Sequence, residues 1–201
     1  MTIGIIGAGL IGSAFARRLA HANLPAILSN SRGPDSLADL IADIGRPVRA
    51  GTREEAAAQG LVLVAVNWSK LPAALSGLPD FGARVVIDAN NPIEPPTFQP
   101  VDLNGRLSTD IVAEHLPGAR VVKAFNHLPA AVLGEDPRVA GGKRVSFFAG
   151  LDAAAKAKVA DLIDKLGFHG IDLGAVSEGG RAIGIPGGGL AGQNLVRLDW
   201  E

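Results

Sequence analysis

Three glycines near the amino terminus have the spacing of a dinucleotide-binding turn. Gly7, Gly9 and Gly12 form a G-x-G-x-x-G pattern that follows a short apolar run and precedes a segment with helical character. In such a unit the first glycine permits a tight turn, the second lets a pyrophosphate approach the backbone, and the third allows close helix packing. The first helical turn, with Leu10 and Ile11, then points its N–H groups at the phosphates. The order of the elements favours dinucleotide binding over the alternative, a tight turn without a ligand.

Neutral and cationic residues follow the second expected strand, residues 25–29. Asn30, Ser31 and Arg32 stand roughly 20 residues after the glycines, where an NAD site places a carboxylate on the ribose 2′-hydroxyl. A guanidinium there would instead form charge-assisted bonds with a 2′-phosphate, each contributing about 1.5–3 kcal/mol, or about tenfold to hundredfold in affinity. The segment predicts NADP rather than NAD, and a solvated turn is the alternative.

Polar and aromatic side chains follow three further expected strands. In open α/β sheets, ligands bind outside the carboxyl ends of the strands, so these residues are candidates for the nicotinamide half of the cofactor and for a second substrate. The alternative is that the asparagines only hold turns. The residues are Asn67 and Trp68 after one strand, Asn90, Asn91 and Pro92 after the next, and Asn126, His127 and Pro129 after the last.

Acid–base and metal chemistry have few candidates in this chain. His127 is the one histidine expected at a strand end and could act as a general acid or base, but the sequence places no carboxylate beside it. Lys123 in the preceding strand could contact the cofactor or substrate, or it could point to solvent. The absence of tyrosine excludes the Tyr–Lys acid of short-chain dehydrogenases. No His, Asp or Glu cluster has metal-ligand spacing, so we expect no catalytic metal.

Composition indicates a globular protein of the cytoplasm. The chain has 201 residues, 47% of them hydrophobic, a formal charge of −1 and no cysteine. A net charge near zero argues against a basic surface that would bind nucleic acid or anionic lipid. No apolar run approaches the roughly 20 residues that span a bilayer.

Strand and helix patterns alternate along most of the chain and predict an α/β protein with a doubly wound, Rossmann-type parallel sheet. We expect an NADP-binding domain over residues 1–125 and a small C-terminal α/β extension over 126–201, packed on it. The proline-rich segment 90–100 is expected to lack regular structure. The glycine-rich segment 177–192 is expected to be a long loop, with a brief helical turn near 190–195.

The glycine fingerprint, Asn30-Ser31-Arg32 and the segment 122–126 (Val-Lys-Ala-Phe-Asn) together resemble the family of coenzyme F420-dependent NADP oxidoreductases. The reductase domains of transmembrane ferric reductases are similar in the same places. The resemblance implies that Ser31 and Arg32 bind the 2′-phosphate. It also implies that a deazaflavin or flavin packs near residues 126–129 and the glycine-rich segment with Gly188, Gly189 and Leu190. Deazaflavin-using members often carry His where this chain has Asn126, so F420, FMN and FAD all stay open as the second cofactor.

These observations favour an NADP-dependent oxidoreductase that exchanges hydride with a flavin or deazaflavin. Such ring-to-ring transfer depends on proximity and orientation and needs no strong general acid. One alternative is an NADPH-dependent reductase of a small carbonyl or imine, and another is a non-catalytic NADP-binding redox sensor. The expected partner is a small redox molecule. A homodimer would help to cover a shallow site, because it is the commonest closed assembly.

Overall fold

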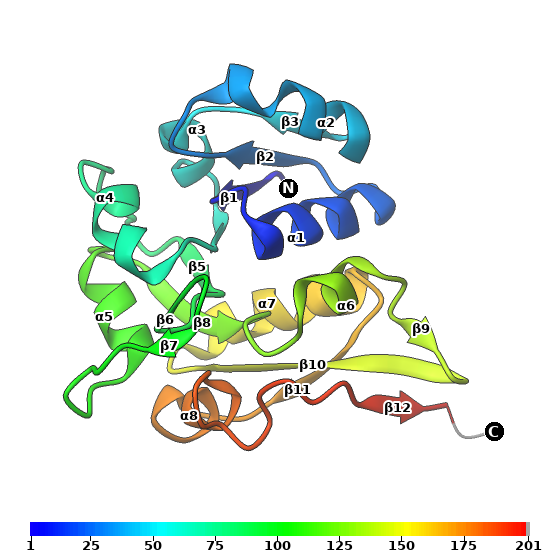
Figure 1. Ribbon diagram of the computed structural model, residues 1–201. Coiled ribbons are helices and arrows are strands. Elements are labelled where there is room, and N and C mark those ends of the chain that lie inside the picture. The colour runs from blue at the N-terminus through cyan, green and yellow to red at the C-terminus, as the bar shows by residue number, and fades with distance from the viewer. Residues whose placement is uncertain (200–201) are drawn as a thin grey trace.

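The computed structural model describes residues 1–199 and is built on one mostly parallel sheet, shown in Figure 1. The strands follow the order β11-β10-β8-β5-β4-β1-β2-β3. The order turns back between β1 and β4, which places a crevice at their carboxyl ends. The expected doubly wound α/β fold is confirmed. The bounds are β1 Ile3–Ile6, β2 Ala26–Ser29, β3 Val48–Ala50, β4 Leu61–Val64, β5 Val85–Asp88, β8 Arg120–Ala124, β10 Gly142–Gly150 and β11 His169–Asp172.

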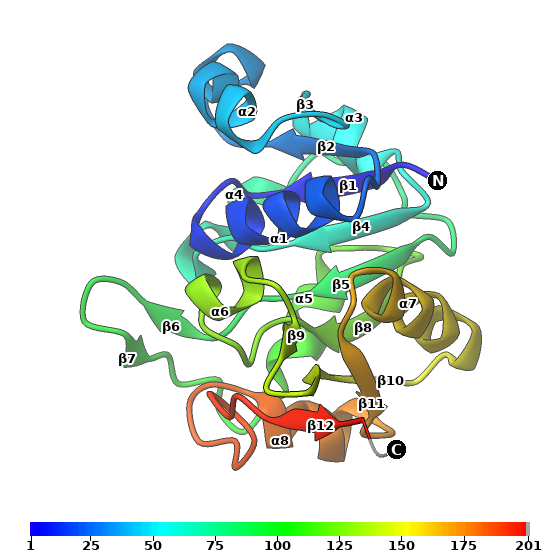
Figure 2. The ribbon, with the colours of Figure 1, turned by 90° about the vertical axis from the view of Figure 1, so that its right-hand side faces the viewer.

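Helices cover both faces of this sheet, which explains why its strands are continuous apolar runs. Figure 2 shows α1 and α6 in front of the sheet, where they pack on the larger hydrophobic core together with α7. A second core lies under α3, α4 and α5 on the opposite face. Phe15 of α1 contacts Phe125, their ring centroids 4.9 Å apart. The helices are α1 Leu10–His21, α2 Ala38–Ile44, α3 Arg53–Ala57, α4 Leu71–Leu75, α5 Ser108–Glu114, α6 Ala130–Gly134, α7 Ala153–Lys165 and α8 Arg181–Ile183.

The C-terminal part of the chain extends the same sheet. β10 pairs antiparallel with β8 and parallel with β11. Two short strands, β9 (Arg138–Val139) and β12 (Val196–Leu198), pair with the first residues of β10. The sheet therefore continues across the expected boundary after residue 125. The division into domains 1–125 and 126–201 stays a prediction, and residues 200–201 lie outside the part of the chain that the structure describes. Within residues 1–199, no helix is long and apolar enough to cross a membrane.

The proline-rich segment contains regular structure, contrary to the expectation for 90–100. β6 (Ile93–Glu94) and β7 (Gln99–Pro100) form a small antiparallel hairpin. Two-residue strands place few demands on backbone N–H groups, so the prolines between and within them are tolerated. The Glu94 carboxylate fixes the hairpin by accepting hydrogen bonds from the Ser69 backbone N–H and hydroxyl.

The helical turn expected near 190–195 was placed wrongly. A π-helical turn at Val176–Gly180 leads directly into α8 instead. Glycine is a weak helix former, but tertiary packing requires it here, because a Cβ at Gly179 would lie 2.5 Å from the Leu173 side chain. Packing that decides a local conformation cannot be recognised from composition.

Candidate functional site

A cavity of about 670 Å³ lies at the carboxyl ends of β1, β2 and β4. Of the residues predicted to bind a dinucleotide, it is lined by Gly7, Gly9, Asn30, Ser31, Arg32 and Asn67. Leu10, Ile11, Gly12, Trp68, Asn90, Asn91 and Pro92 do not line it. Further residues complete the wall and were not predicted from the sequence: Thr52 before α3, Arg53 and Glu54 in its first turn, Lys70 before α4, and Ala73 and Ala74 within α4. For Thr52, which follows β3, the position after a strand was the available signal.

The three fingerprint glycines have different surroundings. Gly7 has φ +111°, and a Cβ there would lie 2.1 Å from the carbonyl oxygen of Ala65. A Cβ at Gly12 would lie 1.9 Å from the carbonyl oxygen of Gly7, so this glycine permits the close approach of α1 to the turn. A Cβ at Gly9 would meet nothing within 4 Å. The space beside Gly9 is therefore open for a ligand, whereas Gly7 and Gly12 are required by the fold.

The start of α1 is suited to an anion. Gly9 is its N-cap residue, provides no side-chain hydrogen bond, and no acidic residue occupies the first turn. The first N–H groups of a helix have no partner inside the helix, and the dipole adds partial positive charge at this end. A pyrophosphate beside Gly9 would satisfy both.

The loop after β2 presents Arg32 to this cavity. The Asn30 carboxamide holds the loop, because its oxygen accepts from the Arg32 backbone N–H at 3.0 Å and its nitrogen donates to Ser36 Oγ at 2.8 Å. Ser31 and Arg32 are exposed, and the Arg32 guanidinium has no hydrogen bond or ion pair within residues 1–199. By contrast, Arg53 is paired with Glu54 at 2.9 Å. Arg32 is therefore free to bind a phosphate here, and Lys70, which also lines the cavity, has no ion pair among residues 1–199 either.

A buried ion pair lies behind the carboxyl ends of β5 and β8. Lys123 Nζ is 3.0 Å from Asp88 Oδ2, and both side chains are at most 1% exposed. The expectation that Lys123 could point to solvent was wrong, because β8 is an interior strand covered on both faces. The other Asp88 oxygen accepts from the Asn90 backbone and side-chain N–H groups, and Thr109 Oγ1 donates to the same oxygen as Lys123.

This network extends to the dinucleotide cavity. Asn90 Oδ1 accepts from the Val66 backbone N–H at 2.8 Å, and Val66 lines the cavity wall after β4. Asn90 is itself almost fully buried. It therefore positions the end of β4 relative to β5, and its side chain is occupied inside the protein.

The two other asparagines join three segments that are distant in sequence. Asn91 Nδ2 donates to the Asn126 carbonyl at 2.8 Å, and Asn126 Nδ2 donates to Asn91 Oδ1 at 3.0 Å and to the Ile183 carbonyl at 2.7 Å. The Ile185 backbone N–H also donates to Asn91 Oδ1, at 3.1 Å. The structure thus brings together the loops after β5 and β8 and the C-terminal residues 183–185. The assignment of these loops to the second substrate stays a prediction.

The remaining predicted residues of the second-substrate site are spread more widely. Pro129 is exposed at the start of α6, and Gly189 is exposed as well. Gly188 is required by its turn, since a Cβ there would lie within 2.7 Å of three carbonyl oxygens. Leu190 packs on the small core formed by Val145, Phe147 and Ile183.

His127 is buried beneath the C-terminal segment. Its ring packs on Phe147, with centroids 5.2 Å apart, and its backbone carbonyl accepts from the Gly192 N–H at 2.8 Å. Burial lowers the pKa of His127 to about 4, so the imidazole is neutral at pH 7. A neutral, buried ring is poorly suited to donate a proton to a substrate.

The His127 pKa predicts a pH-dependent stability. The unfolded chain has an ordinary histidine pKa of 6.5 and binds a proton that the folded protein accepts only near pH 4. Stability is therefore lost as the pH falls from 6.5 toward 4, by about 2 kcal/mol at pH 4.5. Urea unfolding of the wild type and of H127F at pH 7 and pH 4.5 should show a smaller pH effect in H127F. An equal effect in both proteins, with H21F as the exposed control, would contradict the assignment.

The amino-terminal half of the chain matches a known family. Residues 2–92, which carry the fingerprint and the Arg32 loop, match the family described as NADP oxidoreductase, coenzyme F420-dependent. This segment of the chain is similar to that family. None of the curated protein sequences matches it significantly.

Solved structures extend the comparison over the whole chain. A hypothetical protein from Sinorhizobium meliloti is 45% identical, with a TM-score of 0.93 over 98% of this chain and 96% of the other. A candidate F420-dependent NADP-reductase from Arthrobacter sp. FB24 is 28% identical, with a TM-score of 0.73 over 88% and 86%. The reductive aminase of Aspergillus terreus, in complex with NADPH and ethyl-5-oxohexanoate, is 17% identical, with a TM-score of 0.61 over 87% of this chain and 55% of that chain. At that identity the last comparison shows the fold alone.

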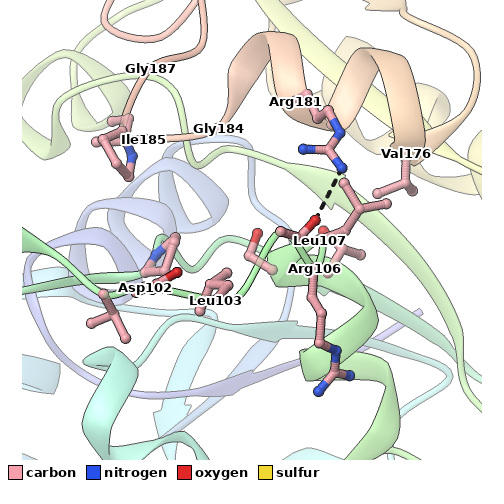
Figure 3. A pocket seen from close by; sticks show the side chains of 16 residues that line it. Asp102, Leu103, Arg106, Leu107, Val176, Arg181, Gly184, Ile185 and Gly187 are labelled. Carbon is pink, nitrogen blue, oxygen red and sulfur yellow. Dashed lines mark hydrogen bonds between the residues drawn. The ribbon is translucent and has the colours of Figure 1, made fainter.

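The protein also has a second cavity, of about 380 Å³ (Figure 3). It lies between the segment 101–109 and the C-terminal segment 176–187. Pro92 and Gly187 connect it to two loops that the sequence analysis assigned to the cofactor and the second substrate. Sequence reasoning missed Arg106, Ser108, Thr109 and Arg181 in its wall, because they lie in segments expected to be a loop or a plain helix.

Proposed function

We propose that this protein binds NADPH and exchanges hydride between it and a flavin or deazaflavin. The observation that carries the NADPH assignment is the cavity in which the open space at Gly9, the uncapped start of α1 and the free Arg32 guanidinium lie together. A pyrophosphate fits the first two features, and a 2′-phosphate fits the third. Bound NADPH would supply a hydride from its nicotinamide ring.

The residues near the sheet edge support ring-to-ring transfer. Hydride passes directly between two stacked rings, so the protein needs to orient them and exclude water rather than to provide a strong acid. His127 is buried and neutral, and Asp88 is fully occupied by Lys123, Asn90 and Thr109. In the part of the chain that the structure describes, no cluster of three His, Cys, Asp or Glu residues could hold a metal.

A reductase of small carbonyls or imines is the second candidate. It is favoured by one observation, the fold shared with the reductive aminase. The same NADPH-binding half would operate in both cases. The two candidates differ in the acceptor, and therefore in the result of a direct assay.

The nucleotide half of the proposal is tested with Arg32→Ala. The wild type should bind NADPH about tenfold to hundredfold more tightly than NADH, and R32A should lose this preference while its NADH affinity stays unchanged. Fluorescence titration measures both affinities. R138A is the matched control, because Arg138 is exposed, is paired with Asp199 and lies outside the cavity. Equal affinities in the wild type would contradict NADP selectivity.

The acceptor half is tested by following NADPH oxidation at 340 nm with F420, FMN, FAD and a set of small ketones and imines. We expect turnover with a flavin or deazaflavin. Turnover only with ketones or imines would replace the proposal by the second candidate. Tight NADPH binding without any turnover would favour a redox sensor.

A further inference from the structure

The second cavity has one mainly apolar end and one cationic end. Figure 3 shows Ile185 and Gly187 at one end and Arg181 and Val176 at the other. The apolar part of its wall suits the body of a flat ring compound. That part consists of Pro92, Val101, Leu103, Leu107, Ile185 and Pro186. Asp102 also lines the cavity, and its carboxylate accepts a hydrogen bond from the Asn104 backbone N–H.

Arg181 is the guanidinium that reaches across this cavity. Its Nη2 donates to the Gly105 carbonyl at 3.3 Å, and no carboxylate pairs with it among residues 1–199. A guanidinium has five N–H donors, so Arg181 keeps donors for an anion. Arg106 differs, because it is paired with Glu114 and its side chain extends away from Arg181 in Figure 3.

The backbone before Arg181 holds it in place. The π-helical turn Val176–Gly180 leads into α8, and such turns occur frequently at functional sites. Gly179 and Gly180 are buried, with Gly179 packed against Leu173 so closely that a side chain could not be added. Arg181 is therefore presented from a packed segment rather than from a loose loop.

The apolar end of the cavity adjoins the edge of the sheet. Ile185 lines the cavity, and its N–H donates to Asn91, which follows β5. The nicotinamide of a dinucleotide extending from Gly9 across the strand ends would approach this edge. Ser108, also in the cavity wall, accepts a hydrogen bond from buried Lys123 at 3.4 Å, so its own hydroxyl hydrogen can point into the cavity.

We propose that this cavity binds the second substrate as a ring compound that carries an anionic group, a phosphate or a carboxylate. The ring lies at the end formed by Pro92 and Ile185, and the anion is bound by Arg181. The assignment of the ring as the hydride partner rests on the proposed function, whereas recognition of the anion by Arg181 can be measured without any turnover.

FMN and riboflavin provide the test, because they share the ring system and differ in one phosphate. Fluorescence titration without NADPH should show that the wild type binds FMN about tenfold to hundredfold more tightly than riboflavin. R181A should lower the FMN affinity to that of riboflavin, R181K should recover part of it, and the NADPH affinity should not change in either variant. R197A is the matched control, since Arg197 is exposed on β12 and lies outside both cavities.

The possible outcomes separate this inference from the proposed function. Equal affinities for FMN and riboflavin in the wild type, an unchanged FMN affinity in R181A, or no saturable FMN binding would overturn the inference. NADPH-dependent reduction of both flavins with equal KM in the wild type and R181A would leave the proposed function standing while removing the anion site. Arg181-dependent FMN binding without reduction by NADPH would support the anion site and count against the proposed function.

Discussion

A side chain at position 9 is expected to abolish NADPH binding while leaving the fold intact. Gly9 has φ −77° and ψ −167°, an extended conformation that any residue adopts, and a Cβ there meets no atom within 4 Å. In G9V the added methyl groups would occupy the space that a pyrophosphate needs. We expect the Kd for NADPH to rise by at least about hundredfold, or about 3 kcal/mol, and the unfolding free energy to change by less than about 1 kcal/mol.

Two further glycine variants make this result specific. Gly60 also has open space around its Cβ position but lies outside the cavity, so G60V should bind NADPH normally. G12A should be destabilised, because its Cβ would overlap the carbonyl oxygen of Gly7. Nucleotide titration and thermal unfolding of the three variants separate a phosphate site from a folding requirement. Normal NADPH binding by G9V would show that the turn is not the phosphate cradle.

The nucleotide half of the site could be predicted because its determinants are local. Gly7, Gly9 and Gly12 lie within six residues, and Arg32 follows the next strand directly. Strand and helix periodicity then fixed their position at one edge of the sheet, since parallel strands end on the same side. In the structure, Gly7, Gly9 and residues 30–32 line the same cavity.

The other half could not be predicted because its determinants are long-range. Lys123 and Asp88 are 35 residues apart, and the hydrogen bond from Asn126 to the Ile183 carbonyl spans 57 residues. Such partners become visible only once the strand order is known. Arg181 lies in a glycine-rich segment, and the composition of this segment predicted a loop. The segment instead forms helical turns because Gly179 packs against Leu173, a contact that the composition does not reveal.

The identity of the second cofactor, the homodimer and the cytoplasmic location stay predictions for a different reason. A second redox ring, a partner subunit and a cellular compartment are not properties of one chain's coordinates. The residues at the sheet edge nevertheless limit the chemistry. Ser108, Arg181 and the backbone offer hydrogen bonds and charge to an acceptor. His127 is buried and neutral, and the Asp88 carboxylate is occupied by bonds inside the protein.

Loss of the buried lysine is expected to be the most destabilising of the substitutions considered. In K123M the carboxylate of Asp88 stays buried and loses its cationic partner, along with the bonds from Nζ to the Asn90 carbonyl and Ser108. Breaking a buried pair by removing one partner costs about 3–5 kcal/mol, which corresponds to a fall in Tm of about 6–20 °C for a protein of this size. Thermal and urea unfolding measure the change directly.

A double-mutant cycle shows whether the loss comes from the uncompensated charge. D88N/K123M carries no buried charge at this place and should be more stable than the sum of the two single changes predicts, by at least about 1 kcal/mol. K165M is the control, since Lys165 pairs with Asp161 at 2.7 Å and both side chains are about half exposed, so its loss should cost less than about 1 kcal/mol. Additive effects in the cycle would mean that Lys123 stabilises the protein through packing alone. A coupled result would establish that the ion pair ties β5 to β8 behind the edge where both cavities meet the sheet.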